Sequence, residues 1–174
     1  LWKTGKDFIW ATRYLRSGFK RSGSMKAWAA GVSSRGSRAY NEDRIFYENT
    51  ENGFLAMAAD GLGGHGGGGV ASELAVEVFA QAFKKNPELT EENMERLAEL
   101  ANREIRKRQT PQVRMRTTFV GLFCGGGEWI SVHMGDSRLY WFEDGVLRFR
   151  TLDHSVSQMA VLAGEISERQ IRFH

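Results

Sequence analysis

Short apolar runs in the first and last thirds of the chain predict β-strands. Turn-forming residues bound these runs, as is typical of strands in antiparallel sheets. Glu51-Asn52-Gly53 and Asp144-Gly145 are turn sequences of the kind that join two neighbouring strands into a hairpin. The strands expected from this pattern span residues 27–34, 44–50, 54–60, 117–125, 128–136 and the two arms of 138–150.

The middle of the chain has instead the 3.6-residue periodicity of amphipathic helices. One helix is expected from Val70 to the break at Asn86-Pro87. Thr90 is the expected N-cap of a second helix, which ends before Thr110-Pro111. Its buried stripe should consist of Met94, Leu97, Ala98, Ala101 and Ile105. With a shorter helix over 155–163, the pattern predicts an α+β fold in which helices flank layered antiparallel sheets.

The first 26 residues are strongly basic, with seven Lys or Arg residues and a single Asp, whereas the whole chain has a formal net charge of +3. Apolar side chains in this segment roughly follow helical spacing, namely Phe8, Tyr14, Leu15 and Phe19. We therefore expect a linker helix that leads in from an upstream domain or packs on the body, with contact to a membrane surface or a partner as the alternative. The main domain, residues 27–174, is net acidic, which counts against nucleic-acid binding.

Composition and cysteine usage place the chain among soluble globular proteins. Hydrophobic residues make up 41% of the sequence and charged residues 26%, and no apolar run approaches the ~20 residues of a membrane-spanning helix. Cys124 is the only cysteine and lies in an apolar strand, which predicts an inert core thiol and a reducing compartment such as the cytoplasm. No signal-peptide pattern is present, and the chain begins with Leu1 rather than Met, which indicates a processed or excised fragment.

The most unusual local feature is Asp60, which ends an apolar strand and precedes a loop rich in glycine. Residues 61–66 fit the pattern GxGxxG, but a dinucleotide-binding fold needs a second parallel strand where this sequence has a second helix. No Gly-Lys-Ser/Thr follows, so a nucleotide P-loop does not fit either. A metal site fits better, because the Asp60 carboxylate and the Gly61 carbonyl are hard oxygen ligands that a glycine backbone lets approach one ion.

Two further turns that bear carboxylates support a metal site. Glu42 and Asp43 directly precede a predicted strand, and Asp136 lies in the turn between two others. Taken alone, the first turn is better explained as a solvated acidic turn, and Asp136 is consistent with a turn cap or a partner of Arg138. Together with Asp60 they form an oxygen-only donor set, which favours Mg²⁺ or Mn²⁺ over zinc.

Three stretches of the chain form one ordered set of motifs. They are RAYNED at 38–43, ADGLGGH at 59–65 with VASELA at 70–75, and MGDSRLYWFEDGVLRFRTLDHS at 134–155. In this order and spacing they resemble the metal-dependent serine/threonine protein phosphatases of the PPM, or type 2C, family, over roughly residues 28–170 and most closely its compact bacterial members. The resemblance implies a β-sandwich flanked by helices, hydrolysis of phosphoserine and phosphothreonine in protein substrates, and a role in signalling.

The resemblance also implies roles for individual metal-site residues. Asp60 would bridge two Mg²⁺ or Mn²⁺ ions, with the Gly61 carbonyl on one of them, and Asp136 would help to hold a third. Glu42 and Asp43 would hold metal-bound waters. The ions would activate a bridging water for in-line attack on phosphorus.

Catalytic roles outside the metal set follow from the same resemblance. Arg38 would grip the substrate phosphate through its guanidinium fork. Leu62 stands where eukaryotic relatives carry histidine. His65 is a candidate for protonating the leaving alkoxide, with ordering of the loop as the alternative. His133 is expected to be structural or exposed, and His154 to be structural.

The sequence departs from the family pattern at two points. Arg116 precedes Thr117-Thr118 where the family usually has glycine. The chain ends at His174, in what resembles the mobile flap segment, before the family's Ser-Asp-Gly and Asp-Asn motifs. We therefore expect a domain that is incomplete at its C-terminus, in which one ion binds weakly or not at all.

Two classes of function remain open from the sequence. A protein phosphatase is favoured because the metal-proximal residues are intact wherever they can be checked. The alternative is a non-catalytic pseudophosphatase, or a module that binds phosphoproteins or another partner. A dinucleotide-binding domain is a distant third.

Overall fold

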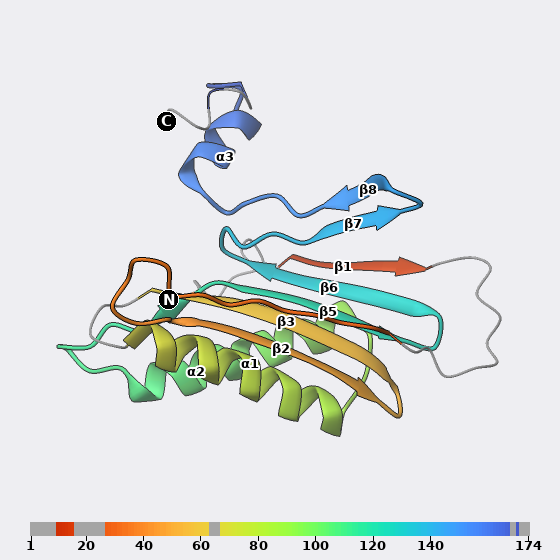
Figure 1. The fold of residues 1–174 in the computed structure, drawn as a ribbon, viewed down its shortest axis with the longest axis horizontal. Coiled ribbons are helices and arrows are strands. Elements are labelled where there is room, and N and C mark those ends of the chain that lie inside the picture. The colour runs from red at the N-terminus through yellow and green to blue at the C-terminus, as the bar shows by residue number, and fades with distance from the viewer. Residues whose placement is uncertain (1–9, 16–26, 63–66, 168–169, 171–174) are drawn as a thin grey trace.

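The computed structural model describes residues 10–15, 27–62, 67–167 and 170, and its main body is a six-stranded antiparallel sheet (Figure 1). The sheet contains β1 (Trp10–Leu15), β2 (Asp43–Thr50), β3 (Gly53–Leu62), β4 (Arg116–Thr117), β5 (Phe119–Gly125) and β6 (Glu128–Met134). Its strand order is β1-β6-β5-β3-β2, and β4 pairs with the end of β3. The remaining elements are the hairpin of β7 (Tyr140–Glu143) and β8 (Val146–Arg150) and the helices α1 (Gly67–Lys85), α2 (Glu91–Arg108) and α3 (Val156–Leu162).

The two long helices cover one face of the sheet. The hydrophobic core lies between this helical layer and the sheet. Side chains alternate between the two faces of a strand, so every second residue of the central strands enters this core. The core members from the sheet are Leu55, Met57, Ala59, Phe119, Phe123, Ile130, Val132 and Met134. Phe79 of α1 lies against both core phenylalanines of β5, with ring centroids 4.3 Å from Phe119 and 6.1 Å from Phe123.

The hairpin β7–β8 covers part of the opposite face. Trp129 of β6 stacks on Trp141 of β7 at 5.1 Å and meets the edge of Phe149 of β8 at 6.1 Å. The expected turn at Asp144-Gly145 is confirmed, since both residues have positive φ, 51° and 76°, as a tight hairpin turn requires. The antiparallel layers flanked by helices agree with the predicted fold class.

Both long helices were predicted, and their observed ends differ from the predicted ends by a few residues. Thr90 caps α2 as expected, because its hydroxyl accepts a hydrogen bond from the N–H of Asn93 at 3.2 Å, and all five residues of the expected stripe are buried. α1 begins at Gly67, three residues before Val70, inside the glycine run. Every described strand pair is antiparallel and α1 leads into α2, which is incompatible with the dinucleotide-binding alternative.

The strand expected over 27–34 is wrong. Residues 27–42 contain no helix or strand, and Trp28 is 99% exposed. The side chain of Asn49 on β2 accepts a hydrogen bond from the N–H of Ala27 at 3.2 Å and donates one to its carbonyl at 3.0 Å. A side chain therefore binds the backbone groups of Ala27 that a strand ladder would have used.

The helix expected near the N-terminus is also wrong where the structure describes it. Trp10–Leu15 forms β1, which pairs antiparallel with β6 from Trp10 opposite His133 to Leu15 opposite Glu128. The edge of β6 offers a row of backbone donors and acceptors, and pairing with them outweighs a weak helical pattern. The domain boundary after residue 26 stays a prediction. Among the described residues, no helix combines the length and the apolarity needed to cross a membrane.

Gly61 and Gly68 make a close backbone contact between the end of β3 and the start of α1. A Cβ on Gly68 would lie 2.6 Å from the carbonyl carbon of Gly61, and one on Gly61 would lie 2.2 Å from the carbonyl oxygen of Gly68. Only glycine fits at either position. The Cβ of a residue at position 69 would meet nothing closer than 3.9 Å, the Cα of Glu42.

This contact predicts opposite effects for two neighbouring substitutions. Gly68→Ala should destabilise the chain by about 1–3 kcal/mol, because backbone atoms must move apart to admit a methyl group. Gly69→Ala is the matched control and should stabilise it by about 0.5–1 kcal/mol, because alanine loses less backbone entropy in a helix. Urea unfolding of both variants measures the difference, and equal stabilities would refute the tight junction.

Candidate active site

Asp43 and Asp60 face each other at the edge of the sheet where β2 begins and β3 ends. They are register partners in the antiparallel β2–β3 pair, so their side chains emerge on the same face. Burial is the largest cause that raises the pKa of Asp60, followed by the charge of Asp43 and a side-chain hydrogen bond to Asp43. Asp60 is exposed by surface area, so only part of its carboxyl group is desolvated. The pair carries more negative charge than its surroundings compensate.

Arg38 and Asp136 act electrostatically on the same carboxylate. The charge of Asp136 raises the pKa of Asp60 further, whereas the charge of Arg38 lowers it. Both residues are exposed; Arg38 lies in the bend before β2 and Asp136 in the turn after β6. Four residues that the sequence singled out therefore belong to one electrostatic site.

Glu42 has a structural task that the sequence did not reveal. Its Oε1 accepts hydrogen bonds from the N–H groups of Gly68 at 3.1 Å and Gly69 at 3.4 Å. Its carbonyl accepts from the N–H of Gly61 at 3.2 Å and from the hydroxyl of Ser72 at 2.6 Å. The carboxylate thus caps the N-terminus of α1, where negative charge and free N–H groups complement each other. It fixes the end of β3 to the start of the helix.

Thr117 and Thr118, which the sequence did not assign to the site, hold the backbone of Asp60. Thr118 donates its N–H to the Asp60 carbonyl at 2.9 Å and accepts the Asp60 N–H on its hydroxyl at 3.0 Å. The Thr117 hydroxyl donates to the same carbonyl at 3.0 Å. The Thr118 hydroxyl also lies 2.5 Å from that of Ser137. It therefore links Asp60 to the turn that carries Asp136.

His154 fixes that turn from the other side. Its backbone N–H donates to the Gly135 carbonyl at 2.9 Å, and its Nδ1 accepts the Gly135 N–H at 3.3 Å. Gly135 has φ +101°, and a Cβ there would lie 2.8 Å from the Thr118 side chain. These contacts agree with the structural role expected of His154. They fix the backbone of Gly135, the residue that precedes Asp136.

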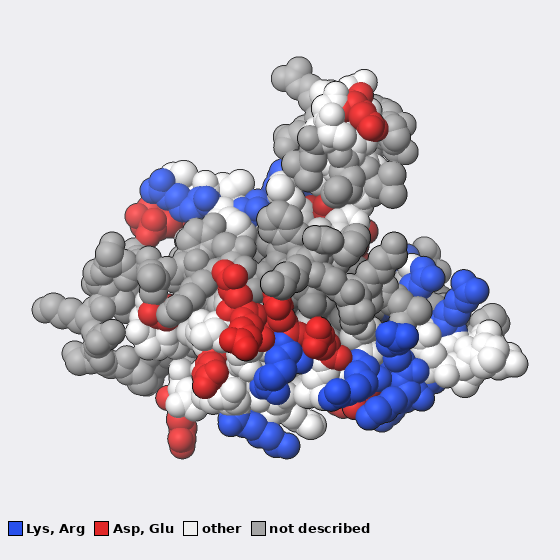
Figure 2. All heavy atoms as spheres, turned by 180° about the vertical axis from the view of Figure 1, so that it is seen from behind, with Lys and Arg blue, Asp and Glu red and all other residues white. Residues whose placement is uncertain are grey.

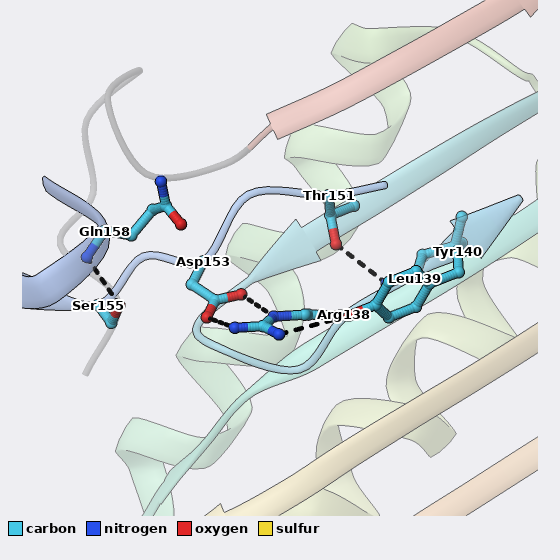
Figure 3. A network of polar contacts seen from close by, with 7 residues as sticks. All are labelled: Arg138, Leu139, Tyr140, Thr151, Asp153, Ser155 and Gln158. Atoms are coloured by element: carbon cyan, nitrogen blue, oxygen red, sulfur yellow. Dashed lines mark hydrogen bonds and ion pairs between the residues drawn. The ribbon is translucent and has the colours of Figure 1, made fainter. Parts of the chain in front are cut away.

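A polar network around Arg138 anchors the segment that carries His154 (Figure 3). Arg138 binds the buried Asp153 through both carboxylate oxygens, with Nε 2.5 Å from Oδ1. This pairing holds the pKa of Asp153 below its usual range. Leu139 and Thr151 exchange two hydrogen bonds of 3.0 Å, and Ser155 accepts the N–H of Gln158 at 3.2 Å at the start of α3. Arg138 therefore pairs with Asp153, so the alternative partner Asp136 is wrong.

Two other candidates for chemistry are part of the packing. His133 is 2% exposed, which excludes the exposed alternative, and its ring lies 4.6 Å from that of His154. Burial lowers the pKa of His133 to about 4, so it is neutral near pH 7. Cys124 is half-buried, and burial raises the pKa of its thiol to about 11, in line with an inert thiol.

The donor chemistry of the site fits a divalent cation. The oxygens of Asp43 and Asp60 are hard ligands. Burial, and after it the charges of Asp43 and Asp136, raise the pKa of Asp60, and a bound cation would offset both effects. Within the described residues, no group of three or more His, Cys, Asp or Glu side chains lies close enough together to hold a metal ion. The metal roles of Asp60, Gly61, Asp136, Glu42 and Asp43 therefore stay predictions. His65 lies outside the described residues, so its role also stays a prediction.

Comparison with known proteins gives one consistent result. Residues 30–166 match the family model for protein phosphatase 2C. The serine/threonine phosphatase stp of Listeria monocytogenes serotype 4b is 34% identical over 146 residues, which cover 79% of this chain and 58% of the Listeria protein. The serine/threonine protein phosphatase PstP of Mycobacterium tuberculosis is 33% identical over 146 residues, with 79% of this chain and 27% of that protein covered.

Solved structures share the fold. The crystal structure of M. tuberculosis PstP/Ppp matches 96% of this chain and 64% of its own with a TM-score of 0.66 and 25% identity. The catalytic domain of PstP in complex with 2 manganese ions matches 94% of this chain and 64% of its own with a TM-score of 0.63 and 25% identity. The serine/threonine phosphatase of S. agalactiae, at 24% identity and a TM-score of 0.68 over 96% of this chain and 65% of its own, supports the fold.

The chain spans 58% of the length of the Listeria relative and 64% of the PstP/Ppp structure. The family match nevertheless covers most of the chain, and it agrees with the antiparallel sheet, the two covering helices and the carboxylate pair at the sheet edge. The chain therefore belongs to the protein phosphatase 2C (PPM) family, and its relatives are of the bacterial type.

Proposed function

We propose that the chain carries the active-site edge of a divalent-metal-dependent phosphatase that hydrolyses phosphoserine and phosphothreonine in protein substrates. The observation that carries the proposal is the Asp43–Asp60 carboxylate pair, which two paired strands hold side by side. Burial is the largest cause that raises the pKa of Asp60, and the charge of Asp43 raises it further. Like charges held together in this way are costly unless a cation binds between them. The names of the relatives, serine/threonine phosphatases, support the same reaction.

The proposed metal ligands are the Asp60 carboxylate, the Gly61 carbonyl and, for a further ion, Asp136. Glu42 and Asp43 would orient water around the ions, and Glu42 is already held rigid by the N-terminus of α1. Bound Mg²⁺ or Mn²⁺ would supply a water that loses its proton near neutral pH and would neutralise charge on the phosphoryl oxygens. The manganese complex of PstP supports a divalent ion of this kind.

Arg38 is the proposed contact for the substrate phosphate. Its guanidinium group is exposed at the site, and its charge already acts on Asp60. A planar guanidinium offers two parallel N–H donors that match two phosphate oxygens. His65 is the proposed proton donor to the leaving group.

Two further proposals concern the location of the protein and the contacts of its first 26 residues. Cys124 is the only cysteine of the sequence, which fits a reducing compartment, and we propose a cytoplasmic location on that basis. Contact of residues 1–26 with an upstream domain or a membrane surface is proposed on their positive charge alone.

Catalysis is tested on the 174-residue chain with a phosphothreonine peptide. We expect hydrolysis that requires Mn²⁺ or Mg²⁺ and falls by more than about 100-fold in Asp60→Asn, because loss of a residue around a metal ligand alone costs about 10- to 100-fold. Asp144→Asn is the matched control, since it removes an exposed carboxylate at the hairpin turn, where asparagine tolerates the positive φ. Phosphopeptide binding by a folded chain without turnover would contradict catalysis by these 174 residues. It would leave two alternatives, the pseudophosphatase and an enzyme that needs a further C-terminal segment.

Metal-free stability gives a test that does not need turnover. The folded structure raises the pKa of Asp60, so the penalty is present above that pKa and disappears as the pH falls below the unfolded value. Asp60→Asn should therefore raise the melting temperature in EDTA at pH 7.5, and the gain should shrink as the pH is lowered towards 4.

Added Mn²⁺ extends this test. It should stabilise the unsubstituted chain more than the variant, because binding to the folded state alone adds stability. If Asp60→Asn were no more stable in EDTA than Asp144→Asn, the predicted cost of the ionised Asp60 carboxylate would be contradicted.

A further inference from the structure

A strip of exposed cations lies beside the candidate active site. We define the basic strip as Arg103, Arg106, Lys107, Arg108, Arg114 and Arg116, all of which are exposed. Between residues 103 and 116 the sequence holds these six cations and one acid, Glu104, which pairs with Lys107 at 2.7 Å. Figure 2 shows Lys and Arg side chains gathered at one end of the surface, separate from an acidic area nearer its centre.

Strand pairing places the end of this strip next to Asp60. Arg116 lies opposite Leu62 in the β3–β4 pair, and the neighbouring pair is Gly61 with Thr117. From strand geometry, the Cα atoms of Arg116 and Asp60 are roughly 8 Å apart, two residues along β3 and one strand across. Arg114 borders the start of α1, since its carbonyl oxygen lies 2.9 Å from where a Cβ of Gly67 would be.

The end of α2 is tied to the same surface. The Gln109 side chain donates to the carbonyl of Met115 at 2.6 Å. Thr110 and Val113 exchange two backbone hydrogen bonds of 3.3 Å, which closes the turn between α2 and β4. These contacts tie the end of α2 to the segment that carries Arg114 and Arg116.

Helix electrostatics explains only part of the basic strip. Cations in the last turn of α2 stabilise the negative end of the helix, and this accounts for Arg106, Lys107 and Arg108. Arg114 and Arg116 lie beyond the helix. Neither forms an ion pair with another described residue.

We propose that the basic strip binds an acidic stretch of polypeptide, so that the site prefers phosphorylated residues flanked by Asp or Glu. This inference rests on the proposed function for its substrate, and an acidic flank is the class of partner that several exposed guanidinium groups fit. An extended peptide spans roughly 8 Å in two or three residues. Arg116 therefore contacts an acid two or three positions from the phosphorylated residue, and the cations of α2 contact acids further along.

Binding is tested first, with peptides that need no turnover. Fluorescence anisotropy compares three labelled, unphosphorylated peptides on the 174-residue chain: one rich in Glu, one with Gln at the same positions and one with Lys. We expect the Glu peptide to bind most tightly and its affinity to fall as NaCl rises, because salt screens exposed charges. Arg116→Gly should weaken it about two- to fivefold, and the double variant Arg114→Gln with Arg116→Gln about tenfold.

Lys85→Gln is the matched control. It removes an exposed cation from the last turn of α1, about 27 Å along the helix from the site, and should leave the affinity unchanged. Equal binding of the Glu and Gln peptides, or an equal loss in Lys85→Gln, would overturn the proposal. Tighter binding to phosphatidylserine vesicles or single-stranded DNA than to the Glu peptide would also overturn it.

Hydrolysis then separates this inference from the proposed function. With phosphothreonine peptides, the double variant should lose its preference for acidic flanks through a higher KM, with kcat unchanged. Selective binding of the Glu peptide by a chain that hydrolyses nothing would uphold the basic strip and count against catalysis by these 174 residues. Hydrolysis with no preference between acidic and neutral flanks would uphold the phosphatase proposal and refute the role of the basic strip.

Discussion

The site depends on one backbone contact, the approach of the end of β3 to the start of α1. Gly61 and Gly68 pack so closely that neither position admits a Cβ, and the Glu42 carboxylate closes the junction by accepting two N–H groups of the helix. The contact joins the sheet to the helix layer at the point where Asp60 emerges. Displacement of either element would move the carboxylate, and the close contact explains why glycine stands at positions 61 and 68.

A second set of contacts holds the far side of the site. Thr118 bonds to both backbone groups of Asp60 and approaches the Ser137 hydroxyl, while His154 binds the backbone of Gly135 on both its N–H and carbonyl. Behind His154, the ion pair of Arg138 with Asp153 anchors the chain after β8. Like charges at Asp43 and Asp60 therefore sit in a frame that cannot relax easily, which is the arrangement that a cation site needs.

Charge is divided sharply across this edge of the molecule. Carboxylates converge where β2 and β3 meet, and the described cations of the basic strip lie beside them on the segment from α2 to β4. Opposite charges close together without neutralising each other create a steep local potential, which steers a ligand that carries negative charge of its own. Arg38 lies in the bend before β2, and its charge lowers the pKa of Asp60.

The two long helices and the hairpins were predictable from the sequence, because helical periodicity, caps and turn residues act within a few positions of one another. The candidate residues were predictable because they lie in short motifs. Tertiary structure alone decided that Trp10–Leu15 is a strand rather than a helix, since that depends on the free edge of β6. It also decided that Glu42 caps α1 and that Arg138 pairs with Asp153. These outcomes rest on contacts between residues 15 to more than 100 positions apart, and no local pattern encodes which distant group will lie within hydrogen-bonding reach.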